Sequence, residues 1–552
     1  MKKNGAQIVL EVLHEHHINT IFGYPGGAVI PFYHELFAQF DRFKHIRTAH
    51  EQGAVHAADG YARSTGELGV CVVTSGPGVT NTITGIATAY MDSAPLLVIS
   101  GQVPSALLGK DSFQEVDITG IAMPITKYTF LVRKLDELES IVRKAIKVAT
   151  SGRPGPVLID IPKDLFVKET DFPSEIALVY DVKLPSVDLE AVKEACDLIN
   201  ASKKPMIYAG GGVRISNASE ELRKLCYDKQ IPIVNTLMSL GTFPRTHPLS
   251  LGMVGMHGYP EANMAITHSD LIIAIGARFS DRVIGNPKDF APGAKVIHID
   301  FDFTEFSKNI DSDIDLCGDL NQILRMMNKN VNNKERKVWH DEIASFVDPG
   351  APKLTHELTA KSIIEKVAEG VGEETVVVTD VGQHQMWTAQ FYPFTSPRQF
   401  ITSGGLGTMG FGLGAAIGTS LGNPDKHVVL FTGDGSFRMN CNELATVSGY
   451  DVPILIVLLN NQALGMVRQW QKLFQEERYA ETTIYQNIDY CKLADAYGIK
   501  GIKCEGLSDL EDAVKLFVAS GKSLFVECMI DQDDDVYPIV PPGQSIAKYI
   551  MK

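Results

Sequence analysis

The residues of this chain whose types and spacing most suggest chemistry are a glycine-flanked aspartate and a pair of asparagines. Gly433-Asp434-Gly435-Ser436 follows one apolar run, and Asn460-Asn461 follows the next, with Asn461 27 residues after the aspartate. The strands of a parallel sheet end at one edge, so two such strands would bring Asp434 and Asn461 together. Their oxygens, beside backbone amides that glycine leaves exposed, suit Mg²⁺ completed by phosphate oxygens and water. Ala463 has no side-chain donor, so a third protein ligand there would be its carbonyl. Without such strands, a glycine-flanked aspartate would equally fit a hairpin turn.

The elements that would position these residues are short apolar runs separated by helix-length segments. Such runs, bounded by glycine and proline, predict buried parallel strands that helices cover on both faces. They occur in three groups along the chain, namely 69–74, 95–100 and 156–161, then 205–209, 270–275 and 295–300, then 375–379, 427–431 and 452–459. The predicted fold is therefore α/β, with three doubly wound parallel-sheet domains.

Two segments that lose this rhythm indicate the domain boundaries. Val167–Pro185 is typical of a linker, and the polar segment Asn328–Lys353 separates a third unit from the second. A chain of 552 residues has room for three or four domains, at roughly 150 residues each. We expect domains over residues 1–170, 185–335 and 355–552.

The first and third domains echo each other in sequence. A gapless shift of 358 positions places Ala57-Ala58-x-Gly60 on Ala415-Ala416-x-Gly418, and the apolar strands coincide as well. Over residues 51–95 the identities exceed the about three that average composition would give by chance. The echo predicts one shared fold for the two outer domains around a different middle domain, although unrelated doubly wound units also resemble one another.

Composition excludes several classes of protein. Hydrophobic residues make up 45% and charged residues 21% of the chain, which is ordinary for a globular protein and wrong for a disordered one. The formal net charge of −15, with no basic stripe, argues against binding to nucleic acid or to an anionic membrane. The apolar run 452–459 is far shorter than the ~20 residues that span a bilayer, and the N-terminus has no recognisable signal or transit peptide. The cysteines form no CxxC pair, and they lie at positions 71, 196, 226, 317, 441, 491, 504 and 528. We therefore expect a cytoplasmic enzyme.

The glycine-aspartate-glycine motif with its following asparagine pair resembles the signature of the thiamine-diphosphate enzymes, and the resemblance covers nearly the whole chain. It implies a pyrimidine-binding domain, a middle domain and a diphosphate-binding domain, with one fold shared by the outer two. It also implies a glutamate in the first domain, and His50-Glu51-Gln52 stands at the expected place. Glu51 would shift the cofactor's aminopyrimidine ring toward its imino form, so that the cofactor supplies its own base. Taken alone, Glu51 would instead fit a carboxylate that stabilises the start of a helix.

Six further stretches resemble one branch of this family, the acetohydroxyacid (acetolactate) synthase catalytic subunits. They are, in chain order, residues 22–27, 75–78, 113–117, 276–283, 465–470 and 537–543. The implied reaction decarboxylates pyruvate and ligates the two-carbon unit to a second 2-ketoacid, either pyruvate or 2-ketobutyrate. This is the first common step of branched-chain amino acid biosynthesis. The implied active unit is a homodimer or tetramer whose sites lie between subunits, with a regulatory small subunit as a possible partner.

The resemblance also assigns roles to single residues. The implied catalytic residues are Glu51, Gln114 and Lys163. Met409, the counterpart of Glu51 under the shift, would hold the cofactor bent. The other implied contacts of thiamine diphosphate are Gln383, His384, Gly435 and Ser436, and those of its Mg²⁺ are Asp434, Asn461 and Ala463. The implied substrate contacts are Phe113, Met256, Arg282, Val381 and Trp470.

Two of the substrate contacts have specific expected roles. The planar guanidinium of Arg282 would meet the acceptor carboxylate, and the indole of Trp470 would favour the larger ketoacid. The alternatives are an ion-paired surface residue for Arg282 and a packed core aromatic for Trp470.

The middle domain would hold FAD that performs no net redox chemistry. The implied contacts are Arg153, Gly211, Gly212, Thr236, Leu237, His257, Gly276, Arg278, Arg282, Asp300 and Asp319. Ser280, Asp300, Phe303 and Gly414 depart from the usual family pattern, and these departures leave the fold intact but bear on flavin affinity. The alternatives are a flavin enzyme like pyruvate oxidase and a catabolic acetolactate synthase that lacks FAD.

Overall fold

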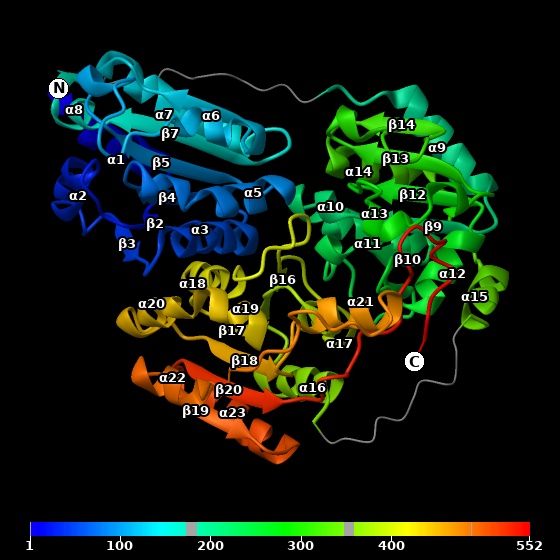
Figure 1. Ribbon diagram of the computed structural model, residues 1–552. Helices are drawn as coiled ribbons and strands as arrows, with labels where there is room; N and C mark the ends of the chain where they lie inside the picture. Colours follow the sequence, from blue (N-terminus) through cyan, green and yellow to red (C-terminus); the bar gives the residue numbers. More distant parts are fainter. Residues whose placement is uncertain (1, 173–184, 347–357, 487, 552) are drawn as a thin grey trace.

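The structure of the chain, a computed structural model, describes residues 2–172, 185–346, 358–486 and 488–551. These residues form three parallel sheets of six strands and one antiparallel pair, β1 (Lys2–Asn4) with β8 (Glu169–Asp171). Figure 1 shows the three sheets as three domains, with the first in blue and cyan, the middle in green and the third in yellow to red. The predicted α/β class with three doubly wound domains is confirmed.

The two outer domains have the same topology. Their strand orders are β3-β2-β4-β5-β7-β6 and β16-β15-β17-β18-β20-β19, so in both the strands follow one another in the order second, first, third, fourth, sixth, fifth. The first domain has the strands β2 (Thr20–Gly23), β3 (Lys44–Arg47), β4 (Gly69–Val73), β5 (Leu96–Gln102), β6 (Tyr128–Leu131) and β7 (Pro156–Pro162). The third has β15 (Thr375–Thr379), β16 (Phe400–Ile401), β17 (His427–Gly433), β18 (Leu455–Asn460), β19 (Lys500–Cys504) and β20 (Leu524–Met529). The shared fold that the 358-residue echo predicts is therefore present.

Helices cover these two sheets. Those of the first domain are α1 (Gly5–Glu15), α2 (Ile30–Phe37), α3 (Glu51–Thr65), α4 (Pro77–Thr80), α5 (Ile83–Met91), α6 (Ile118–Ala122), α7 (Leu138–Thr150) and α8 (Lys163–Val167). Those of the third are α16 (Ala360–Val371), α17 (Gln383–Phe391), α18 (Gly412–Gly422), α19 (Asp434–Asn440), α20 (Leu444–Gly449), α21 (Gly465–Phe474), α22 (Tyr490–Ala496) and α23 (Leu507–Ser520).

The middle domain has a different strand order, β11-β10-β9-β12-β13-β14. Its strands are β9 (Pro205–Ala209), β10 (Ile233–Asn235), β11 (Ser250–Met253), β12 (Leu271–Ile275), β13 (Lys295–Asp300) and β14 (Ile314–Cys317). Its helices are α9 (Leu189–Ala201), α10 (Gly211–Ile215), α11 (Ser219–Lys229), α12 (Pro260–His268), α13 (Asp281–Ile284), α14 (Leu320–Asn330) and α15 (Lys337–Ala344). A different domain thus separates the two related ones, as the sequence predicts.

The outer domains pack against each other through α3 and α18, which lie side by side in Figure 1. The contact is reciprocal, because a Cβ on Gly60 would lie 2.2 Å from the Ala415 carbonyl oxygen and a Cβ on Gly418 would lie 1.7 Å from that of Ala57. These are the residues that the 358-residue shift pairs, so the two helices meet about an approximate twofold axis. Small residues on both faces let the backbones approach this closely, and one apolar core runs through both domains.

A buried ion cluster fixes the same junction. The guanidinium of Arg63, near the end of α3, donates to Asp59 at 2.7 Å and to Asp92 at 2.8 Å. Arg63 also donates to the carbonyl of Thr402, and Asp92 accepts from the backbone amides of Gly404 and Gly405. The cluster ties the first domain to the segment that leads to Met409.

Two predicted boundary segments carry more structure than their composition indicates. Residues 169–171 of the predicted linker form β8, and residues 173–184 lie outside the described part of the chain. In the polar segment 328–353, α15 packs on the middle domain, where Trp339 is buried and its indole N–H donates to the Pro205 carbonyl at 3.1 Å. The interpretation of 328–353 as only a separator is wrong over its first half, while 347–353 lies outside the described residues. None of the described helices combines the length and apolarity needed to cross a bilayer.

Candidate active site

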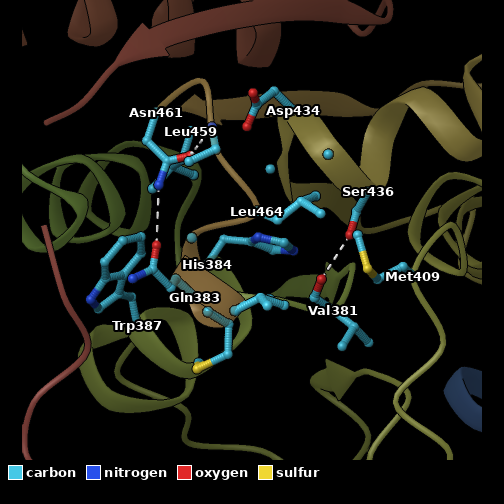
Figure 2. Close-up of a pocket in the computed structure, with 17 residues that line it drawn as sticks. Val381, Gln383, His384, Trp387, Met409, Asp434, Ser436, Leu459, Asn461 and Leu464 are labelled. Carbon is cyan, nitrogen blue, oxygen red and sulfur yellow. Dashed lines mark hydrogen bonds between the residues drawn. The ribbon is translucent and has the colours of Figure 1, made fainter. Parts of the chain in front are cut away.

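The aspartate and asparagine motifs meet at the carboxyl-end edge of the third domain's sheet. β17 and β18 are neighbours, with Gly433 paired to Leu459, so Asp434 and Asn461 follow adjacent strand ends. Both line one pocket together with residues of α17, the Met409 loop and the start of α21 (Figure 2). The pocket is a cleft built from the ends of three neighbouring strands, β15, β17 and β18.

Asp434 has the features of a metal ligand. Its side chain is buried, and its Oδ1 has no hydrogen-bond partner among the described residues. Burial raises the pKa of this carboxyl to about 7. A buried carboxylate oxygen without a donor is costly unless a cation approaches it, so this orphaned atom fits Mg²⁺. In the described chain no three His, Cys, Asp or Glu side chains cluster around a metal site, so the other ligands would be amide, carbonyl, phosphate or water oxygens.

Asn461 is held in a fixed orientation by its neighbours. Its Nδ2 donates to Gln383 Oε1 at 3.1 Å, and its Oδ1 accepts from the Ala463 backbone amide at 3.2 Å. Gln383 in turn donates to Gln469 at 3.2 Å and to the Asp534 carbonyl. Gln383 therefore positions Asn461, a role that the sequence does not reveal. Gln469 also lies outside the predicted site, because only its complete burial marks it as part of this network.

His384 lies where the diphosphate contact is expected. Its Nε2 is buried without a partner among the described residues, and burial lowers the pKa of the ring to about 3, so the imidazole is neutral. A Cβ on Gly433 would lie 2.8 Å from His384 Nδ1, so only glycine leaves room for the ring at this turn. A neutral imidazole with a free ring nitrogen in the pocket can donate one hydrogen bond to an anionic oxygen.

Met409, Ser436 and Val381 lie on the side of the pocket opposite Gln383 and Asn461 (Figure 2), and Gly435 also lines the pocket. Ser436 Oγ donates to the Val381 carbonyl at 2.7 Å, so this hydroxyl braces the wall of the pocket. Asp380 accepts from the backbone amides of Val381 at 3.0 Å and Gly410 at 2.8 Å, next to Met409. Asp380 is absent from the predicted site, although a carboxylate directly after the strand β15 was an available signal for it.

The expected acceptor residues converge from three segments of the chain. Arg282, in α13, lies with its guanidinium carbon 5.9 Å from the ring centre of Trp470 in α21. Its Nη1 is 3.4 Å from the Met256 sulfur. The guanidinium is largely exposed, and its contact with Asp281 is long, at 3.9 Å. The C-terminal segment also contacts this group, because the backbone amide of Val540 donates to the Met256 carbonyl at 2.9 Å. A cationic fork beside an indole and a thioether suits a small carboxylate with an apolar tail.

The first-domain residues form a separate group. Glu51 begins α3 and accepts from Asn81 Nδ2 at 3.0 Å. The turn 75–78 lies between Glu51 and Gln114, since a Cβ on Gly76 would meet Gln114 and one on Gly78 would meet Glu51. Phe113 is 88% exposed, and Lys163 begins α8. Every described residue that lines the pocket of Figure 2 lies between 381 and 467, so none of these first-domain residues lines it.

The residues expected to hold FAD gather at the carboxyl-end edge of the middle sheet. Each follows one of its six strands, except Arg153 in the first domain. They are Gly211 and Gly212 after β9, Thr236 and Leu237 after β10, His257 after β11, Gly276, Arg278 and Arg282 after β12, Asp300 at the end of β13 and Asp319 after β14. Such an edge is the usual place for a nucleotide in a doubly wound domain.

The chemistry of this edge fits a dinucleotide in part. The turns after β9 and β12 are packed backbone to backbone, because a Cβ on Gly212 would lie 2.6 Å from the Gly276 Cα. Burial raises the pKa of Asp300 to about 6. Arg153, however, is paired with Glu305 at 2.5 Å and Asp302 at 3.2 Å, and Asp319 caps α14. The glycine turns could therefore receive a nucleotide, while Arg153 and Asp319 already have protein partners.

Comparison with known proteins identifies all three domains. Residues 3–121, 192–327 and 380–528 match the N-terminal TPP binding, central and C-terminal TPP binding domains of thiamine pyrophosphate enzymes. The chain is 44% identical to the acetolactate synthase isozyme 2 large subunit of Escherichia coli over 553 residues, which cover all of both chains. It is also 44% identical to the acetolactate synthase large subunit of Lactococcus lactis, over 98% of this chain and 95% of that one. A probable acetolactate synthase large subunit of Methanocaldococcus jannaschii is 44% identical as well, over 99% of this chain and 95% of that one. The chain belongs to the acetolactate synthase large-subunit family of thiamine pyrophosphate enzymes.

Proposed function

We propose that the protein decarboxylates pyruvate and ligates the two-carbon unit to a second 2-ketoacid, pyruvate or 2-ketobutyrate. The observation that carries this proposal is the convergence of Arg282, Trp470 and Met256 near a pocket whose buried Asp434 oxygen has no partner among the described residues. The near full-length similarity to acetolactate synthase large subunits supports it. The product class would serve branched-chain amino acid biosynthesis.

Thiamine diphosphate would be held at the third domain's sheet edge. Asp434, Asn461 and the Ala463 carbonyl would bind Mg²⁺, and His384, Gln383, Gly435 and Ser436 would surround the diphosphate. When bound, the cofactor supplies the carbon that attacks the ketoacid. The chain's own contribution is to hold the metal and to keep Met409 against the ring system. Arg282 would receive the acceptor carboxylate, and Glu51 would hold a proton at the aminopyrimidine.

The active unit would contain two copies of the chain. The pocket has no first-domain residue among its described lining, and α3 is packed against the α18 of its own chain, so Glu51 would serve the pocket of a partner subunit. Gln114, Lys163 and Phe113 would accompany it. A homodimer is the minimum assembly, a tetramer contains the same pair, and a regulatory small subunit is a further possible partner.

FAD is proposed for the middle domain in a structural role, held by the glycine turns after β9 and β12. We also propose a cytoplasmic location, on the basis of eight cysteines that are all unpaired. Flavin absorbance of the purified protein tests the first of these points. A colourless, fully active protein would favour a catabolic acetolactate synthase that lacks FAD.

Two inactive variants, Glu51→Gln and Asp434→Asn, test the shared site. If each site takes Glu51 from one chain and Asp434 from the other, mixing the variants yields heterodimers with one intact site and one doubly altered site. Random exchange at equal amounts should restore about a quarter of the wild-type acetolactate formation. Mixtures that stay inactive although exchange is demonstrated would contradict the shared site.

Oxygen uptake should be measured in the same vessel with pyruvate, thiamine diphosphate, Mg²⁺ and FAD. Acetolactate without stoichiometric oxygen loss is the expected result. Oxygen consumption with acetate or acetyl phosphate as product would instead identify a pyruvate oxidase.

A further inference from the structure

Glu443 of the third domain lies directly under the start of the helix that carries Glu51. It ends the short 3₁₀ helix Cys441–Glu443, which follows the Asp434 helix α19, and its side chain is completely buried. Its Oε1 accepts from the His50 backbone amide at 3.0 Å, and its Oε2 accepts from that of Ala49 at 3.1 Å. Both amides belong to the residues just before Glu51, so the carboxylate holds the backbone at the point where α3 begins.

The carboxylate is itself fixed in place. Thr446 Oγ1 donates to Glu443 Oε2 at 2.6 Å. A Cβ on Gly53 would lie 2.0 Å from Glu443 Oε1, so the carboxylate fills the space that a side chain in the first turn of α3 would need. All three groups that face the carboxylate are donors, and an acceptor-only group is what this site requires.

The approximate symmetry of the two outer domains shows that this arrangement is not a by-product of the shared fold. Under the 358-residue shift, the counterpart of Glu443 is Gly85, which has no side chain. The start of the counterpart helix α18 is held by Asp380 of its own domain, through the Gly410 amide. The first domain also supplies a carboxylate to the third, Asp92, but it accepts from the Gly404 and Gly405 amides, whereas Glu443 binds the two amides directly before Glu51.

We infer that Glu443 is a positioning residue, which clamps the Ala49 and His50 amides so that Glu51 projects at the angle its proton transfer requires. The inference rests on the proposed function, because it assumes that Glu51 meets the aminopyrimidine ring. Proton transfer depends steeply on placement, and a displacement of about 1 Å costs on the order of 100-fold in rate. Loss of the clamp should therefore slow activation of the cofactor while the pocket around Asp434 still binds it.

Three substitutions of Glu443 should weaken its hold on the start of α3 to different degrees. Glu443→Ala removes all three accepted hydrogen bonds. Glu443→Gln keeps the shape but turns an N–H₂ group toward at least one donor, and Glu443→Asp shortens the reach by one methylene. Tyr450→Phe is the matched control, because it removes a bond from the same domain junction, the Arg47 amide to the Tyr450 hydroxyl at 2.9 Å, without touching the start of α3.

Two measurements separate positioning from general damage. The first is backbone amide hydrogen exchange of the peptide around residues 48–53 in cofactor-free protein, which leaves out the Arg47 amide that Tyr450→Phe itself releases. The second is the rate at which the thiazolium proton of bound thiamine diphosphate exchanges with deuterium, measured without substrate after acid quench. We expect faster amide exchange in Glu443→Ala, thiazolium exchange slowed about 10- to 100-fold, an intermediate effect in Glu443→Gln and wild-type behaviour in Tyr450→Phe.

The outcomes can be told apart. Slow thiazolium exchange in Glu51→Gln but wild-type exchange in Glu443→Ala, with cofactor bound in both, would overturn the positioning role and leave the proposed function intact. Wild-type exchange in Glu51→Gln would overturn the role of Glu51 itself, and the inference about Glu443 with it. If Glu443→Ala does not fold, the Glu443→Gln and Glu443→Asp variants give the same comparison, and wild-type exchange in both would refute the inference.

Discussion

Replacing Gly418 by alanine is expected to force α3 and α18 apart. The added Cβ would lie 1.7 Å from the Ala57 carbonyl oxygen, whereas an ordinary contact begins at 3.4 Å, so the helices must separate by about 1.7 Å. The obstacle is backbone, which cannot rotate away as a side chain can. Overpacking destabilises a protein by about 1–3 kcal/mol, and for this backbone contact we expect about 3 kcal/mol. The higher helix propensity of alanine offsets about 1 kcal/mol of that destabilisation. The net expected loss is about 2 kcal/mol in the free energy of unfolding.

Gly449→Ala is the matched control for this prediction. Gly449 is the last residue of α20, is exposed, and has nothing within 4 Å of the position that an added Cβ would take. The same chemical change should therefore be neutral or stabilise by up to about 1 kcal/mol, so the two variants should differ by about 2–3 kcal/mol in urea denaturation. Acetolactate formation should fall in Gly418→Ala, because Glu51 moves with α3. Equal stability of the two variants would refute the tight helix crossing.

Two further predictions concern specificity and pH. Trp470→Leu removes apolar contact area from the group of acceptor residues. 2-Ketobutyrate exceeds pyruvate by one methylene, whose burial contributes about 0.8 kcal/mol. With both acceptors present, the ratio of 2-aceto-2-hydroxybutyrate to acetolactate should therefore fall about fourfold. An unchanged ratio would exclude Trp470 from the acceptor pocket. Burial raises the pKa of Asp160 from 3.8 to about 7, although hydrogen bonds from Ser100 and Gln102 act in the opposite direction. The folded state therefore binds this proton more tightly than the unfolded state does. As a result, the free energy of unfolding of the wild-type protein falls as pH rises from about 4 to 7. Asp160→Asn should therefore gain stability relative to wild type by up to about 1.4 kcal/mol per pH unit in that window and level off above pH 7. A difference that stays constant across this range in denaturation experiments would contradict the buried, protonated state of Asp160.

The apolar runs of the sequence predict nine of the eighteen strands in the described parallel sheets, and with them the sheet edge, because both depend on local sequence. Each predicted apolar run contains a strand, and the polar residues directly after β17 and β18 lie together since parallel strands end at one edge. The apolar run 452–459 is longer than the part of it that forms a strand, which begins only at Leu455, because Pro453 lacks the amide that a ladder needs. The prediction fails where the determining contact is distant. Trp339 stands in a polar stretch, and only its bond to Pro205 reveals that α15 belongs to the middle domain.

The residues that position others were the hardest to predict. Glu443 and Gln469 carry ordinary polar side chains on helices, and nothing in their spacing marks them, whereas Asp380 directly follows the strand β15. Their roles depend on backbone amides, a backbone carbonyl and an amide side chain 30 to 394 residues away in the chain. Such contacts can be known only once the fold is assembled. The proposed metal ligands Asp434 and Asn461, by contrast, can be predicted from their places directly after strands.

The duplicated outer domains offer a physical reason for the proposed division of the site between two copies of the chain. Because α3 and α18 are related by the 358-residue shift, each domain presents the same sheet edge, but the edges carry different chemistry: Glu51 starts one helix, and Met409 stands at the same position before the other. The reciprocal contact of Gly60 with Ala415 and of Gly418 with Ala57 uses the helix faces within the chain. The pocket around Asp434 has no first-domain residue among its described lining, which supports the proposal that Glu51 serves the pocket of another copy. Glu443 has a position that no other described carboxylate shares. It follows the Asp434 helix of its own chain's pocket, and it holds the backbone before Glu51, which we propose acts in the pocket of the partner copy. A change at that single side chain should thus act on the neighbouring site and leave metal binding in its own chain unaffected.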